Sequence, residues 1–214
     1  MNQYKRNYIY QLADLYEPRT IFLQEYRQDT KLKIFGYKSH FLDIEATKNR
    51  RLYTISRNDL ELKISNTYYQ IMTDSMNDQI LINVHMPNHL PQYKTTLHNL
   101  REDLENTYSG AENIIIGGDW NLDISNPKKY ELAKLKKIKK FMREFNLCKS
   151  EMDHNTLPTH NDLNGNLNRC IDFFMISKEM KTSIASTQTQ TSDYSDHSAK
   201  IVYLLDTKKT NFKL

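Results

Sequence analysis

The sequence predicts one α/β or α+β domain, built as two packed β-sheets with helices on the outside. Its length of 214 residues is about that of a single domain. Short apolar runs bounded by polar turns recur from residue 20 to residue 205, and segments with helical spacing interrupt them only a few times. We therefore expect one domain over residues 1–205 and a frayed tail over residues 206–214.

Three segments have the apolar spacing of helices that bury one face. The first covers residues 5–16 and ends before Pro18, and the second covers residues 91–108. The third follows Asn126, a favourable N-cap, and Pro127, a favourable first helical residue, and it runs to about residue 146. The expected core positions are Ile9, Leu12, Leu15 and Tyr16 in the first helix, Leu97, Leu100, Leu104 and Tyr108 in the second, and Leu132, Leu135, Ile138, Met142 and Phe145 in the third.

The remaining apolar runs predict β-strands separated by polar turns. A polar loop over residues 149–168 divides the last three strands from the rest. The predicted strands are residues 20–23, 37–42, 51–56, 60–65, 67–72, 79–85, 113–116, 170–176, 183–189 and 200–205.

Composition excludes several classes of protein. No apolar run approaches the roughly 20 residues of a membrane span, so no membrane partner is expected. Gly 5 and Pro 5 are too few for a collagen-like or Pro/Gly-rich disordered chain. The two cysteines, Cys148 and Cys170, are too few for a disulfide scaffold and favour an intracellular, reducing compartment.

The net charge of +4 permits a polyanionic partner without requiring one. The third predicted helix is rich in lysine over residues 128–140, and such a face would bind nucleic acid in a salt-dependent, sequence-independent way. An ordinary solvated helix face is the alternative. The lysines in question are Lys128, Lys129, Lys136, Lys137 and Lys140.

Polar side chains recur where the predicted strands begin or end. One Asp or Asn at a strand end means little, because these residues favour turns. Several that converge at one sheet edge would offer hard oxygen ligands, which suit Mg²⁺ or Mn²⁺, and a histidine beside an aspartate suits a phosphate. These residues are Gln24, Glu25, His85, Asn88, Asp119, Asn121, Asp172, Asp196 and His197, whereas His154 and His160 lie in the polar loop and are expected to be solvated.

The motifs around these residues resemble the endonuclease/exonuclease/phosphatase superfamily. They are, in order, LQE (23–25), NVHMPN (83–88), GGDWN (117–121), PT (158–159), RCIDFF (169–174) and SDHSA (195–199), and the match extends over residues 5–205. Within the superfamily they look most like apurinic/apyrimidinic-type nucleases and the endonuclease domains of LINE-type retrotransposons. The resemblance implies a DNase I-like four-layered sandwich of two mixed β-sheets flanked by helices.

The resemblance also implies catalytic roles. Glu25 would ligate a divalent metal, Mg²⁺ or Mn²⁺, and Asp196 would support that site. Asp119 would orient the attacking water, and Asn121 would hold the scissile phosphate. His197 would contact the phosphate, with Asp172 fixing its tautomer. His85 would donate a hydrogen bond to phosphate from a position where nuclease members usually carry tyrosine. The implied nucleic-acid contacts are Asn88, Thr159, Arg169 and Ser195.

One family element has no counterpart in this sequence. Family members begin with a strand that ends in a metal-binding asparagine, but here no apolar strand precedes the first helix, and neither Asn2 nor Asn7 follows one. Truncation, replacement by a strand from a partner chain, and decay of the gene are the alternatives.

The sequence thus predicts a metal-dependent hydrolase of phosphodiesters, first of all a DNA-nicking endonuclease of retroelement type, with DNA preferred over RNA. A catalytically inactive subunit of a larger assembly is the second interpretation. A phosphodiesterase or phosphatase for small substrates is the third.

Overall fold

The computed structural model describes residues 3–25, 32–40, 52–107, 113–150, 158–161, 167–191 and 195–205. The expected tail over residues 206–214, together with Tyr108 and His154, lies outside the described residues.

The larger sheet positions the polar residues. Its strands are, in spatial order, β4 (Glu61–Ser65), β5 (Tyr69–Asp74), β6 (Gln79–His85), β7 (Ile114–Asp119), β11 (Asp172–Ser177) and β8 (Leu147–Lys149). Among these strands only β6 and β7 run parallel, so both end at the same edge. Strand β11 runs antiparallel to β7 and starts at that edge, where Asp172 lies opposite Asp119.

A second β-layer packs on one face of this sheet. It contains the antiparallel strands β1 (Thr20–Gln24), β3 (Leu52–Ser56) and β2 (Lys38–His40) in the order β1-β3-β2, and the pair β12 (Ile184–Gln190) and β13 (Ala199–Leu204). Strand β1 packs against β6 and β7, while β13 packs against β11. A short ribbon of β9 (His160–Asn161) and β10 (Leu167–Arg169) extends from the site end of β11.

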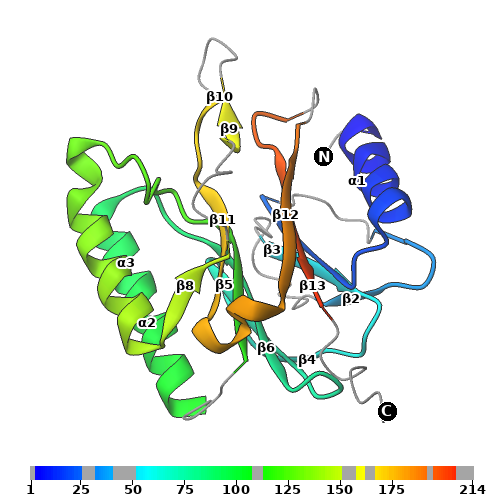
Figure 1. The fold of residues 1–214 in the computed structure, drawn as a ribbon, viewed down its shortest axis with the longest axis horizontal. Coiled ribbons are helices and arrows are strands. Elements are labelled where there is room, and N and C mark those ends of the chain that lie inside the picture. Colours follow the sequence, from blue (N-terminus) through cyan, green and yellow to red (C-terminus); the bar gives the residue numbers. More distant parts are fainter. Residues whose placement is uncertain are drawn as a thin grey trace.

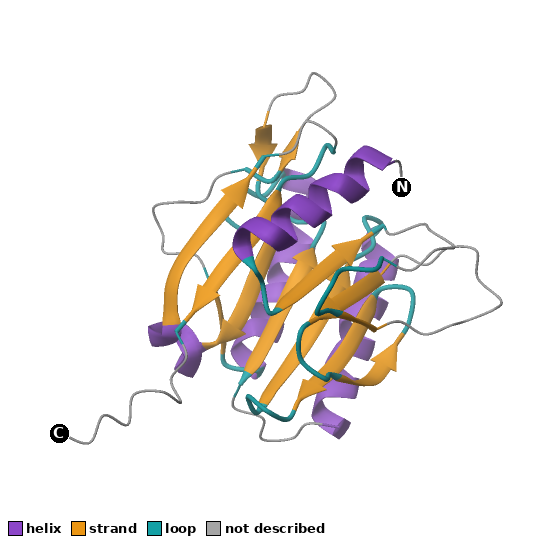
Figure 2. Ribbon diagram, turned by 90° about the vertical axis from the view of Figure 1, so that its right-hand side faces the viewer, coloured by secondary structure: helices purple, strands orange, loops and turns teal. Residues whose placement is uncertain are grey.

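Helices complete a four-layered sandwich (Figures 1 and 2). Helices α2 (Leu90–Thr107) and α3 (Leu132–Glu144) cover the outer face of the larger sheet, where Leu100, Leu104 and Ile138 join its core. Helix α1 (Gln3–Tyr16) covers the outer face of β1 and β3 through Ile9. A third apolar cluster fills the space between the two β-layers, which confirms the predicted architecture.

The third helix starts later than the sequence predicts. The backbone N–H of Asn126 donates to Asp123 Oδ1 in a turn, so Asn126 is not the N-cap and Pro127 is not the first helical residue. A 3₁₀ turn, η1 (Lys129–Glu131), precedes α3, and the Lys128 N–H donates to the Glu131 carboxylate. This start sets which side chains face inward, so Lys134 takes the core-facing position of the first turn and Leu132 is 52% exposed.

Other departures are local. Leu15 of α1 is exposed and Ala13 takes its place in the packed face, because Ile9 and Ala13 are one helical turn apart. Strands β8, β9 and the start of β10 fall within or beside the segment predicted as a polar loop. They are only two or three residues long, and so lack the apolar run on which the prediction of a strand depends. A second 3₁₀ segment, η2 (Lys178–Ser183), follows β11. Among the described residues, no helix combines the length and apolarity needed to cross a bilayer.

Candidate active site

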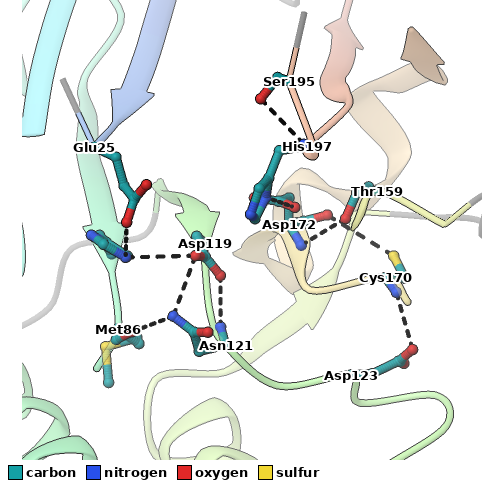
Figure 3. A network of polar contacts seen from close by, with 11 residues as sticks. Glu25, Met86, Asp119, Asn121, Asp123, Thr159, Cys170, Asp172, Ser195 and His197 are labelled. Atoms are coloured by element: carbon teal, nitrogen blue, oxygen red, sulfur yellow. Dashed lines mark hydrogen bonds and ion pairs between the residues drawn. The ribbon is translucent and has the colours of Figure 1, made fainter. Parts of the chain in front are cut away.

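The polar strand ends converge at one edge of the larger sheet (Figure 3). Glu25 follows β1, Asp119 ends β7 and Asp172 begins β11, while His197 forms an isolated bridge beside β9. The antiparallel direction of β11 is what brings Asp172 to this edge, although it starts a strand rather than ending one.

Asp119 owes its position to the two glycines before it. Gly118 has φ +141°, a conformation that side chains rarely adopt, and a Cβ there would overlap the Val84 carbonyl oxygen of the neighbouring strand. Directly after this close approach of β7 to β6, the Asp119 Oδ1 accepts the backbone N–H of Asn121 at 2.8 Å. Trp120 is fully buried, and its indole N–H donates to the Phe173 carbonyl at 3.1 Å. This hydrogen bond holds the segment after β7 against strand β11.

The surroundings of the Asp119 carboxyl group disfavour its charged form. Burial and the nearby charge of Asp172 raise the pKa of Asp119 to about 7, against the opposing influence of His197. A carboxyl group that exchanges its proton near neutral pH is suited to general base chemistry. The repulsion between Asp119 and Asp172 is also one that a bound cation would relieve.

His197 and Asp172 form the hydrogen-bonded pair that the sequence predicts. The His197 Nδ1 lies 2.9 Å from the Asp172 Oδ2. Burial lowers the pKa of His197, but the hydrogen bond and charge of Asp172 outweigh burial and raise that pKa to about 9. The imidazole is therefore a cation at neutral pH, with its Nε2 left to meet an anion.

Two hydroxyl groups, one just before β9 and one before β13, hold the backbone of this pair. Thr159 is fully buried, and its hydroxyl accepts the Asp172 N–H at 3.0 Å. The Ser195 hydroxyl accepts the His197 N–H at 3.2 Å. These two hydroxyls thus orient the aspartate–histidine pair, and the predicted contacts of Thr159 and Ser195 with nucleic acid stay predictions.

His85 sits between two carboxylates. Its Nε2 lies 3.6 Å from the Asp119 Oδ2 and 3.9 Å from the Glu25 Oε1. The Glu25 side chain is 65% exposed, so it borders the site from the solvent side. His85 thereby links Glu25 to Asp119, two groups that the sequence assigns to metal binding and to water activation.

The asparagines are held by contacts that the sequence did not indicate. The Asn121 Nδ2 donates to the Met86 carbonyl at 2.7 Å, which fixes this amide beside Asp119. The Lys134 ammonium donates to the Asn88 Oδ1 and to the Asn121 carbonyl, each at 3.2 Å. Burial lowers the pKa of Lys134, and the neighbouring Glu131 opposes that shift.

Lys134 was missed because its helix was predicted to begin earlier, in a register that faces Leu132 inward. The Arg169 guanidinium lies 2.5 Å from the buried Glu131 carboxylate, and its predicted contact with nucleic acid stays a prediction. Asp123 was also missed, although its Oδ2 accepts the Cys170 N–H and ties the turn after β7 to the start of β11.

The five lysines predicted to lie on the outer face of the third helix are all exposed: Lys128, Lys129, Lys136, Lys137 and Lys140.

Two groups of side chains have the spacing of metal ligands among the described residues. Asp119, Asp172 and His197 form one, and His160, Asp196 and His197 form the other, with the ligand atoms of each group within 4.8 Å of one another. The paired carboxylates of the first suit a hard cation such as Mg²⁺ or Mn²⁺. Glu25 belongs to neither group and reaches the first through His85, so its role as a ligand stays a prediction.

A family comparison identifies the relatives of this site. The family model described as endonuclease-reverse transcriptase matches residues 79–201, which is more than half of the chain. The chain belongs to this endonuclease–reverse transcriptase family. The match includes Asp119, Asn121, Asp172 and His197, and it places the chain in the endonuclease/exonuclease/phosphatase superfamily, as the motifs predict.

Solved structures agree on the fold. The endonuclease domain of TRAS1, a telomere-specific non-LTR retrotransposon, is 11% identical with a TM-score of 0.73, over 95% of this chain and 93% of that domain. The 3′ phosphatase NExo from Neisseria, bound to a product DNA hairpin, is 16% identical with a TM-score of 0.76, over 94% and 95% of the two chains. An AP endonuclease from Archaeoglobus fulgidus is 15% identical with a TM-score of 0.74, over 94% and 95%. No curated protein sequence matches the chain.

Proposed function

We propose that this member of the endonuclease–reverse transcriptase family is a divalent-metal-dependent endonuclease that nicks DNA, as an endonuclease of retroelement type does. Family membership supports phosphodiester hydrolysis in general. The observation that carries the finer proposal is the placement of Asp119. Its buried carboxyl lies between the His197–Asp172 pair and the Glu25–His85 pair, at the edge where the strand ends converge.

The chain's own groups would divide the reaction between them. Asp119 would orient a water molecule and accept its proton, because its buried carboxyl lies beside the His197–Asp172 pair and His85 at the edge where the strand ends converge. The protonated His197 would face the phosphate and stabilise the negative charge that develops on its oxygens. Mg²⁺ or Mn²⁺, held by Asp119 and Asp172 with Glu25 nearby, would supply Lewis-acid stabilisation.

The test is nicking of supercoiled plasmid with Mg²⁺ or Mn²⁺, compared with EDTA. Asp119→Asn removes the base while keeping the size of the side chain, and we expect it to lower the rate at least 100-fold. Asp59→Asn is the matched control, since Asp59 is exposed and pairs with Lys38 away from the site. Equal rates for Asp119→Asn and wild type would refute the proposal. Turnover of a small phosphomonoester without nicking would favour the phosphatase interpretation.

A second candidate is a non-catalytic subunit completed by a strand from a partner chain. Among the described residues, β1 is an edge of its sheet and β13 is an edge of its pair, yet both pack on neighbouring strands of the larger sheet. Unpaired edges invite an added strand. Folded protein that binds duplex DNA but does not nick it with either metal would favour this candidate over the endonuclease.

A further inference from the structure

His160 lies against the proposed catalytic histidine instead of in solvent. The rings of His160 and His197 meet edge to face, with centroids 4.8 Å apart. Backbone pairing sets this approach, because the Asn161 N–H donates to the Asp196 carbonyl at 2.8 Å and the Ser198 N–H donates to the Thr159 carbonyl at 2.7 Å. The two rings are therefore held together by strand geometry.

The Nδ1 of His160 is buried and accepts or donates no hydrogen bond among the described residues. A buried polar atom without a partner is costly, so such an atom indicates a ligand or a role. The Asp196 carboxylate is exposed, and it lies within 4.8 Å of the ligand atoms of both imidazoles. Asp172 occupies the Nδ1 of His197, so a metal held by this group would bind the Nε2 of His197.

This ligand set differs in chemistry from the paired carboxylates beside it. Two imidazoles and one carboxylate suit Zn²⁺, whereas Mg²⁺ prefers oxygen ligands. Ligands of tetrahedral zinc lie about 3.3 Å apart when its bonds are about 2.0–2.1 Å long. A movement of roughly 1 Å by the exposed Asp196 and the partly exposed imidazoles would bring the ligand atoms to this spacing. Asp172 would orient His197 through its Nδ1, as carboxylates commonly do for zinc-bound histidines.

We propose that His160, Asp196 and His197 form an inhibitory Zn²⁺ site. Inhibition rests on the proposed endonuclease function, because zinc would take the Nε2 with which His197 faces the phosphate. Zinc binding itself does not depend on that function, so the two are tested by separate measurements.

Zinc titration calorimetry on the full chain tests the site directly. We expect one Zn²⁺ per chain, bound at least tenfold more weakly by His160→Phe and by Asp196→Asn, and unchanged in the matched control His98→Phe. His98 is an exposed residue of α2 that pairs with Glu102 away from the site. His160→Gln keeps a polar side chain, and weakened binding in this variant at an unchanged melting temperature would show that the loss is not caused by misfolding. X-ray absorption of the zinc complex should show two histidine ligands.

Plasmid nicking with Mg²⁺ tests the inhibitory role. Micromolar Zn²⁺ should inhibit wild type, and His160→Phe should need at least tenfold more zinc for the same inhibition. Equal zinc affinity in wild type and His160→Phe would overturn the site. If zinc binds as expected and no protein nicks DNA, the site stands and the endonuclease proposal fails.

Discussion

Replacement of Asp172 by Asn should leave the His197 imidazole mostly uncharged at neutral pH. The carboxylate accepts from the His197 Nδ1 at 2.9 Å, and it is the main influence that raises the pKa of this imidazole to about 9. The amide of Asp172→Asn keeps an oxygen in the same place but carries no charge. We therefore expect the pKa of His197 to fall to the ordinary value of about 6.5 or below.

The size of the effect follows from these two values. At pH 7.5 an imidazole with a pKa of about 9 is about 97% protonated, whereas one with a pKa of about 6.5 is about 9% protonated. Asp172→Asn should therefore leave about tenfold less of the cationic form, and nicking at this pH should fall by at least that factor.

The assay is an NMR titration of the histidine rings in metal-free protein. A His197 pKa that stays within about half a unit of wild type would refute the assignment of Asp172 as the cause. Stability gives an independent check. Because folding raises the pKa of His197 above about 6.5, its contribution to stability is complete below that pH and is lost as the pH rises towards 9. Wild type should lose thermal stability over this range, and Asp172→Asn should lose less.

Three further predictions concern the rest of the site. Gly118→Ala should lower the free energy of unfolding by about 3 kcal/mol or more, measured in urea, because its Cβ would strike the Val84 carbonyl; Gly36→Ala, with open space, should cost less, and equal losses would contradict the overlap. Lys134→Met should slow nicking about tenfold, because Asn88 and Asn121 would lose the hydrogen bonds that position them. The exposed Lys137→Met should leave the rate unchanged. Glu25→Gln should raise the Mg²⁺ concentration needed for half-maximal nicking, and an unchanged requirement would remove Glu25 from the metal site.

The sequence by itself determined the layers of the fold and the identity of the central site residues. Apolar runs and helical spacing are local signals, and they indicated most strands and all three helices to within a few residues. Asp119, Asp172 and His197 could be chosen because each stands in a short motif next to a strand end. The same signals failed for β8 and β9, which are too short to have a pattern of their own.

Only the tertiary structure decided which polar groups support that site. Lys134 looks like one more lysine of a basic helix until the capping contact of Glu131 sets the register and turns it inward to Asn88. Thr159 acquires its partner Asp172, and His160 its neighbour His197, only when the chain folds these distant segments together. Such contacts join residues far apart in the chain, and their energies depend on burial and orientation. A linear pattern of residue types contains neither, so the sequence indicated the chemistry while the fold decided its geometry.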